Sequence, residues 1–268
     1  MKKTAAWVAC ALLLLAANLA FAGLEWQATT VSKTGGETDT TITHAYAQDG
    51  NVREEFVSVP KGTKGLNKQG SWWLYRGDSN TIYIVDPEEK AYTAVNFDSI
   101  LQLTGAMSQL VQMKITNLKV EVTELPDEAV AGYQCKHIMI TTSYDMEMKV
   151  MIMKVKQHSE QTREIWGTKD VALKDMAMAF NRKAFRTGMA GLDTLIQIQM
   201  EPYKEIGFFL KSITTDKTVD QKGKESIRTS ATTMSDLSTK PLSDQLFKIP
   251  DGYKKISLTP PGPKLDED

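Results

Sequence analysis

Cysteine is nearly absent from this chain of 268 residues, which contains only Cys10 and Cys135. If the first 22 residues are removed, Cys135 has no partner, so no disulfide can form within the chain. We therefore expect stability to come from a packed hydrophobic core. We also expect Cys135 to be a buried structural residue of low reactivity.

The sequence also lacks a large excess of either positive or negative residues. The chain has 32 Lys and Arg residues against 33 Asp and Glu residues, for a formal net charge of −1. Without Lys2 and Lys3 the positive residues fall from 32 to 30, which leaves the balance slightly negative. Nucleic acids and strongly anionic membranes attract basic surfaces, so we expect no nucleic-acid partner, while peripheral contact with a membrane stays open.

Motifs for catalysis are absent as well. The three histidines are His44, His137 and His158, and none lies near Gly-x-Ser-x-Gly, His-Glu-x-x-His or another nucleophile motif. The carboxylates of Glu54 and Glu55 alternate across an expected strand and are interpreted as solvated charges. Cys135 and His137 share a strand face, but two ligands without a second close pair do not indicate zinc. We therefore predict a protein that is not an enzyme, with no catalytic residues, no cofactor and no metal site.

Long hydrophobic runs are confined to the N-terminus. There, Lys2 and Lys3 precede an uncharged stretch, residues 4–21, and small residues flank the bond after Ala22. This three-part order is typical of a secretory signal peptide, which is cleaved so that the mature chain starts at Gly23. We expect a periplasmic or secreted protein.

Two other interpretations of this segment are less favoured. A retained membrane helix would need about 20 apolar residues, whereas the strongly apolar part of the segment is shorter and contains Asn18. A lipoprotein signal at Cys10 would need Leu where Trp7 stands. No later run approaches a membrane span, because Lys, Asp or Glu interrupts each one.

The mature part opens with a period of two, which predicts β-strands. Leu24, Trp26 and Ala28 alternate with polar neighbours, and the dipeptide Asp49-Gly50 predicts a tight hairpin turn. The later expected strands are Trp72–Tyr75, Ile82–Val85, Tyr92–Val95, Ile115–Val122, Tyr133–Thr142, Met146–Val155, Phe208–Thr215 and Ser226–Met234. Between them we expect a loop at Lys61–Gly70, a turn at Asp86–Lys90 and a break at Leu125–Asp127, with an extended closing segment, Phe247–Leu258.

Two segments change to helical spacing. From Asn96 to Val111 the apolar residues follow a period of about 3.6, and residues 172–200 are rich in Ala, Met, Leu, Lys and Arg. Both helices must bury apolar surface, for which a β-sandwich leaves little room. The expected fold class is mainly β (α+β): one large curved antiparallel sheet, or half-open β-barrel, with two helical segments on the concave side.

Several short motifs resemble an uncharacterised family of bacterial periplasmic proteins. They are Trp72-Trp73-Leu74-Tyr75, the hairpin 82–95 with its following helix, Gly132-Tyr133-Gln134-Cys135, Glu164-Ile165-Trp166 with Lys169-Asp170 after it, and the segment Phe247–Lys254. That family is similar in build to the LolA and LolB lipoprotein carriers. The resemblance implies a half-open barrel, lidded by helices, whose apolar interior holds acyl chains. In the carriers an arginine in the sheet helps to control the lid, and no arginine of this sequence is matched to it.

One domain is expected after the signal. Residues 1–22 form the signal peptide, residues 23–258 a single LolA-like β domain, and residues 259–268 a disordered tail that is Pro-rich and then acidic. The oligomeric state is left open.

Methionines gather in one region of the chain, at Met139, Met146, Met148, Met151 and Met153. Thioethers are soft ligands, so Met-based binding of Cu(I) is one alternative. We favour a core or cavity lining, because side chains of one strand alternate between two faces and flexible Met side chains suit an adaptable apolar cavity.

The favoured function is non-catalytic binding or carriage of a lipid-like or lipidated hydrophobic ligand. The candidate cavity residues are Trp26, Trp73, Met146, Met148, Met176, Phe180 and Leu195. The partner would then be a lipid or a lipidated protein. The main alternative is an envelope structural or stress-related protein with a packed core and a protein partner.

Overall fold

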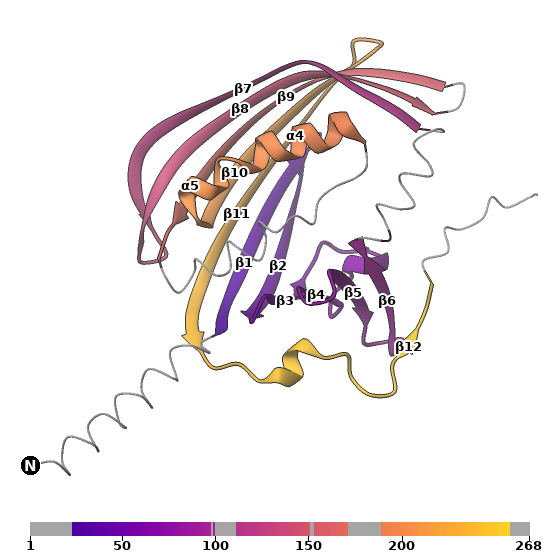
Figure 1. The fold of residues 1–268 in the computed structure, drawn as a ribbon, viewed down its shortest axis with the longest axis vertical. Helices are drawn as coiled ribbons and strands as arrows, with labels where there is room; N and C mark the ends of the chain where they lie inside the picture. The colour runs from indigo at the N-terminus through magenta and orange to yellow at the C-terminus, as the bar shows by residue number, and fades with distance from the viewer. Residues whose placement is uncertain (1–22, 98, 100–110, 151–152, 171–188, 258–268) are drawn as a thin grey trace, which may run out of the picture.

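The computed structural model describes residues 23–97, 99, 111–150, 153–170 and 189–257 (Figure 1). They form one sheet of twelve strands in the order β12-β6-β5-β4-β3-β2-β1-β11-β10-β9-β8-β7. The strands are β1 (Gly23–Thr34), β2 (Glu37–Gln48), β3 (Asn51–Ser58), β4 (Trp72–Arg76), β5 (Thr81–Asp86), β6 (Ala91–Asn96), β7 (Val111–Val130), β8 (Tyr133–Val150), β9 (Met153–Thr168), β10 (Phe208–Asp220), β11 (Glu225–Lys240) and β12 (Lys254–Lys255). The helices are α4 (Ala190–Met200) and α5 (Tyr203–Ile206), with 3₁₀ turns η1 (Gly65–Asn67) and η2 (Asp244–Phe247). The chain is mainly β, as predicted.

The sheet is mixed, which corrects the expectation of a purely antiparallel one. Every neighbouring pair is antiparallel except β12 and β6, which run parallel, with Lys254 opposite Ala91. The parallel pair arises because the closing segment returns past β3 to the far end of the sheet, a route that alternation in the sequence does not reveal. The sheet does not close, since β7 and β12 are its two ends.

Local turn chemistry sets the short hairpins. Asp49 and Gly50 have φ angles of 51° and 75°, as the tight turn between β2 and β3 requires. Between β5 and β6, Asp86 Oδ1 accepts hydrogen bonds from the backbone N–H groups of Glu88 and Glu89 at 3.1 and 3.3 Å. The structure confirms both predicted hairpins.

The strands β7 and β8 are longer than expected. The predicted break at residues 125–127 is wrong, because the ladder between β7 and β8 shifts register there and continues through a β-bulge that accommodates Pro126. The predicted single strand Met146–Val155 is also wrong, since Met148 pairs with Val155 across a hairpin. No Gly or Pro marks that turn in the sequence.

The helical prediction is confirmed over part of its length. α4 lies within the predicted segment 172–200, and Pro202 follows its end. Residues 171–188 and most of the first predicted helix lie outside the described residues. In the described ranges α4 is the one helix longer than a single turn, and no helix there is long and apolar enough to cross a membrane. Two helical segments on the concave side therefore stay a prediction.

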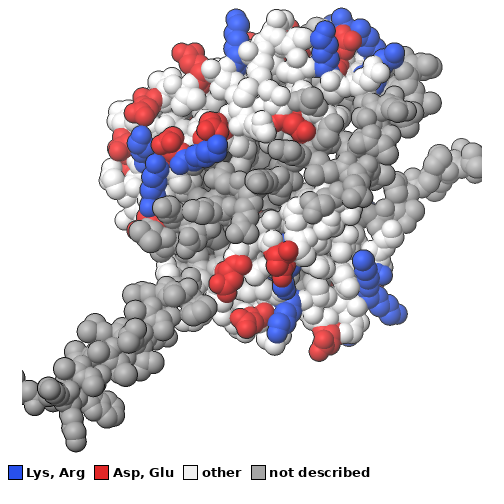
Figure 2. All heavy atoms as spheres, viewed as in Figure 1, with Lys and Arg blue, Asp and Glu red and all other residues white. Residues whose placement is uncertain are grey.

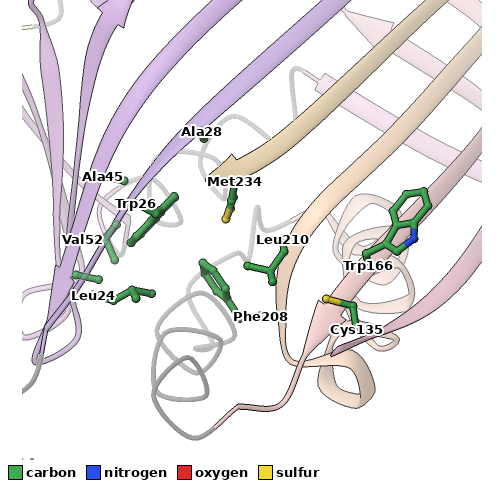
Figure 3. Close-up of a cluster of buried hydrophobic side chains, with 11 residues drawn as sticks. Leu24, Trp26, Ala28, Ala45, Val52, Cys135, Trp166, Phe208, Leu210 and Met234 are labelled. Carbon is green, nitrogen blue, oxygen red and sulfur yellow. The ribbon is translucent and has the colours of Figure 1, made fainter. Parts of the chain in front are cut away.

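Buried apolar side chains form three clusters. The first contains Leu24, Trp26, Ala28, Ala45, Ala47, Val52, Cys135, Trp166, Phe208, Leu210 and Met234 (Figure 3). The second contains Trp72, Leu74, Val85 and Phe247, and the third contains Ile138, Ile140, Ile165 and Ile206. Each cluster joins segments that are distant in the sequence, so burial of apolar surface holds the long sheet and its ends in one arrangement.

Candidate functional site

Helices α4 and α5 lie against one face of the sheet, which we call the helix-side face (Figure 1). Ile206 of α5 packs with Ile138 and Ile165. Gln199 Nε2 of α4 donates a hydrogen bond to Gln161 Oε1 at 3.5 Å. Ile138 and Ile165 are direct cross-strand partners, and Gln161 precedes Ile165 by four residues on β9, so their side chains are on the same face. Residues in register with these therefore share the helix-side face.

An apolar groove of about 400 Å³ lies between these helices and the strands β7 and β8. Its apolar lining consists of Val120, Val122, Ile138, Ile198, Pro202 and Ile206. Its charged residues are Glu124, Lys136, Glu201 and Glu205. Val122 is 49% exposed, so the groove presents hydrocarbon directly to solvent.

The carboxylates of this groove each have a lysine partner. The pairs are Glu124–Lys136 at 3.2 Å, Glu205–Lys169 at 3.3 Å and Glu201–Lys204 at 2.5 Å. Blue and red side chains also lie beside one another over the part of Figure 2 that β7 and β8 occupy in Figure 1. Because these pairs offset one another, the groove combines an apolar lining with little net charge at its opening, an arrangement that suits a hydrocarbon chain better than an ion.

A second apolar region holds two of the predicted cavity residues. Trp26 is 4% exposed, and its ring packs edge-on against Phe208 with 5.7 Å between ring centroids (Figure 3). Trp26 lies directly opposite Ala45 on β2, and Ala45 lies directly opposite Glu54 on β3. Glu54 in turn lies opposite Trp73. The two tryptophans therefore share one face of the sheet, and both pack in the first cluster.

Glu54 places a carboxyl group in this apolar region. Burial raises the pKa of Glu54 above its usual value, and a hydrogen bond with Thr43 offsets part of that shift. Desolvation penalises the charged form of a carboxyl group, which is the physical cause of the shift. The structure corrects the interpretation of Glu54 as a solvated charge, because its side chain is partly buried on the face that holds Trp26 and Trp73.

A second groove, of about 380 Å³, is more polar. Its lining is Thr116, Asp145, Met146, Glu147, Lys156, Gln157, His158, Val219, Asp220 and Gln221. His158 Nδ1 lies 2.7 Å from Asp145 Oδ1, and the nearby Asp145 carboxylate raises the pKa of His158. Asp145 also accepts a hydrogen bond from Asn117 Nδ2 at 2.6 Å. These contacts give Asp145 and His158 hydrogen-bond partners within the protein itself.

The methionine-rich stretch is divided between strands. Met148 pairs with Met113 of β7, and Met146 pairs with Ile115. Met113 was not among the predicted residues, because its place opposite Met148 depends on how the strands pair. Met151 lies outside the described residues, and Cu(I) binding stays a prediction.

Cys135 is fully buried at 0% exposure, which confirms its predicted burial, and desolvation raises the pKa of its thiol. The ring of His137 stacks on Trp166 with 3.9 Å between centroids, and His137 Nε2 lies 3.2 Å from Glu164 Oε2. Lys211 Nζ lies 4.0 Å from the Trp166 ring centroid. No group of three or more His, Cys, Asp or Glu side chains that could hold a metal ion occurs in the described part of the chain.

The predicted cavity residues do not all meet in one described pocket. Trp26 and Trp73 share a cluster, Met146 lines the polar groove, and Met148 lies in the β8–β9 hairpin. Leu195 of α4 is buried, and Met176 and Phe180 lie outside the described residues.

The apolar groove itself was not predicted from the sequence. Val120 and Val122 alternate in a predicted strand, and this alternation indicated the side of the groove that β7 forms. The pattern does not indicate which helix packs over these two residues.

The chain belongs to DUF4412, a domain family of unknown function whose model matches residues 37–253, and this confirms the predicted resemblance to an uncharacterised family. Among solved structures it is similar to an outer membrane lipoprotein-sorting protein domain from Vibrio parahaemolyticus, with 11% identity, a TM-score of 0.31, and coverage of 84% of this chain and 89% of that one. It is also similar to a DUF1329 family protein from Desulfovibrio piger ATCC 29098, with 12% identity, a TM-score of 0.26 and the same coverage of 84% and 89%. No curated protein matches.

Proposed function

We propose that this member of the DUF4412 family is a non-catalytic periplasmic protein that binds and carries a hydrophobic ligand, with an acyl chain of a lipid or lipidated protein in the apolar groove. The groove is the observation that carries the proposal. Branched aliphatic side chains from β7, β8, α4 and α5 converge on about 400 Å³, within the usual size of ligand sites.

The exposed apolar surface of the groove favours a bound hydrophobic ligand. Val122 leaves about half of its surface in water, and burial of apolar surface is favourable by roughly 25 cal/mol per Å². A hydrocarbon chain would remove this surface from water without having to satisfy any polar group of the apolar lining. The paired carboxylates and lysines would stay at the water boundary.

The predicted lid and export signal belong to the same proposal. The helical segment with Met176, Phe180 and Leu195 would cover the ligand, and the Trp26 and Trp73 region would extend the apolar surface. Export and cleavage after Ala22 would bring the protein to the periplasm, where it would meet lipids and lipidated proteins of the envelope.

A charge placed in the groove tests the proposal. Val122→Asp should weaken the binding of a fluorescent fatty acid by about tenfold or more, because an unpaired carboxylate against an acyl chain loses its hydration. Titration of the purified protein, followed by the change in fluorescence, measures this affinity.

Val57→Asp is the matched control, because Val57 lies on strand β3 with 48% exposure against 49% for Val122. It should bind the fatty acid as the parent does, and both variants should melt near the parent temperature. Failure of the parent to bind any acyl probe, or unchanged binding by Val122→Asp, would contradict the proposal. The alternative of an envelope structural protein with a protein partner would then be favoured.

A further inference from the structure

Three methionine side chains lie together on the helix-side face, beside the hairpin that joins β8 to β9. β8 pairs with β9 without a shift in register, so side chains along β8 alternate regularly between the two faces. Met146 and Met148 therefore share the face of Ile138, which packs against α5. Met113 of β7 lies directly opposite Met148, so its side chain is on this face too.

The spacing of these residues allows their sulfur atoms to meet at one point. Residues directly opposite one another on antiparallel strands have Cβ atoms about 4.5–5.5 Å apart, and diagonal neighbours are about 7–8 Å apart. Met113 and Met148 are the direct pair, and Met113 and Met146 are the diagonal one. Because a Met side chain is unbranched and flexible, each sulfur atom can adjust its position to a shared ligand.

Packing of the core does not account for these methionines. Within the described ranges, none of them belongs to the three buried clusters, and each is partly exposed. Val155, the partner of Met148 on β9, is 41% exposed. β-branched and aromatic residues are the ones enriched at half-buried strand positions, so methionines at adjacent positions are not what sheet formation itself favours. A small ion can reach the three sulfur atoms from water.

Charged side chains of the same strands are on the other face of the sheet. Lys114, Glu147 and Lys149 alternate with the methionines and therefore point away from them. On that face Glu147 pairs with Lys154 at 2.7 Å, so its carboxylate already has a positive partner. Among the described residues, a metal ion between the methionines would thus have thioethers as its ligands. Thioethers are soft ligands that favour Cu(I), whereas Zn²⁺ is bound by thiolate, imidazole or carboxylate groups.

Helix α4 begins next to the methionines and leaves them partly exposed. A Cβ atom at Gly191 would lie 3.5 Å from the backbone N atom of Ile115, so the first turn of α4 rests on the row that Ile115 forms with Met146. The positive end of the helix dipole would oppose a cation, and the negative charge of Asp193 in the same turn offsets it.

We propose that Met113, Met146 and Met148 form a binding site for one Cu(I) ion, which their thioether groups coordinate. Copper binds as Cu(I) and is released as Cu(I), so no electron is transferred. The apolar groove at Val120 lies roughly 20 Å from Met113 along β7, so the metal site is separate from the acyl site and does not rest on the carrier function. Strand pairing, which brings Met113 to Met148, gives the site its third ligand.

Titration of the purified protein with Cu(I) tests the site, under anaerobic conditions with ascorbate to keep the copper reduced and bicinchoninate as a coloured competitor. The parent should bind one equivalent of Cu(I), and Zn²⁺ should not displace it. Met113→Leu and Met148→Leu should each weaken Cu(I) binding about tenfold or more, because each removes one of the thioether ligands. Leu has nearly the volume of Met, so both variants should fold as the parent does.

Met139→Leu is the matched control, because Met139 is also a partly exposed residue of β8 but is on the opposite face. Cys135→Ala tests the buried thiol, which is another soft ligand. Both control variants should bind Cu(I) as the parent does. The site is overturned if the parent binds no Cu(I), if either Met113→Leu or Met148→Leu binds it unchanged, or if a control variant that is folded by circular dichroism loses as much affinity.

Discussion

At the scale of single residues, Glu54 shows how the fold changes the chemistry of a side chain. Its raised pKa means that folding favours the protonated form relative to the unfolded chain. Its contribution to stability is then complete below the unfolded pKa, near 4.5, and is lost as the pH rises through the folded pKa. Glu54→Gln should therefore raise the melting temperature, relative to the parent, more at about pH 7 than at about pH 4.

Thermal melts followed by circular dichroism at the two pH values measure this difference. Glu121→Gln, on the exposed part of β7, is the control and should show no such dependence. A Glu54→Gln variant with the same difference from the parent at both pH values would contradict the burial of that carboxyl group.

At the scale of elements, the segment that follows β11 packs against β3 to β6 and stabilises them. Phe247 is 5% exposed and packs in the second cluster, and Arg53 and Arg76 donate hydrogen bonds to the carbonyl groups of Leu246 and Phe247 at 3.0 and 3.2 Å. Phe247→Ala should lower the free energy of unfolding by about 3–5 kcal/mol, because it leaves a cavity in a buried cluster.

Urea denaturation measures this loss. Ile256→Ala, in the same segment but 52% exposed, should change the free energy of unfolding by no more than about 0.5 kcal/mol. Equal effects of the two substitutions would show that burial of Phe247 does not stabilise the sheet.

At the scale of the whole molecule, one hydrogen-bonded sheet connects all described strands. Near its middle, β1 pairs with β11 and so connects the first described strand to a late one, through eleven residue pairs from Gly23–Lys240 to Thr34–Arg228. We expect one cooperative unfolding transition, with coincident urea midpoints by tryptophan fluorescence and by far-ultraviolet circular dichroism. Separate midpoints would show that the β3–β6 part and the β7–β11 part unfold independently.

The sequence by itself determined the elements whose causes are local. Alternation marked the strands near Trp26 and Trp72, and Asp49-Gly50 and Asp86-Pro87 marked hairpins, because turn geometry depends on a few adjacent residues. Cys135 was also predicted correctly as buried. In each case the relevant physical preference is contained in a short window of the chain.

The tertiary structure alone decided which strands became neighbours. Alternation gives a strand two faces but names no partner, so the pairing of β1 with β11, the parallel β12 and the continuation of β7 past Pro126 could not be read from it. The apolar groove and the partial burial of Glu54 both follow from that pairing. Burial of apolar faces selects among many possible arrangements, and that choice depends on contacts between residues far apart in the chain.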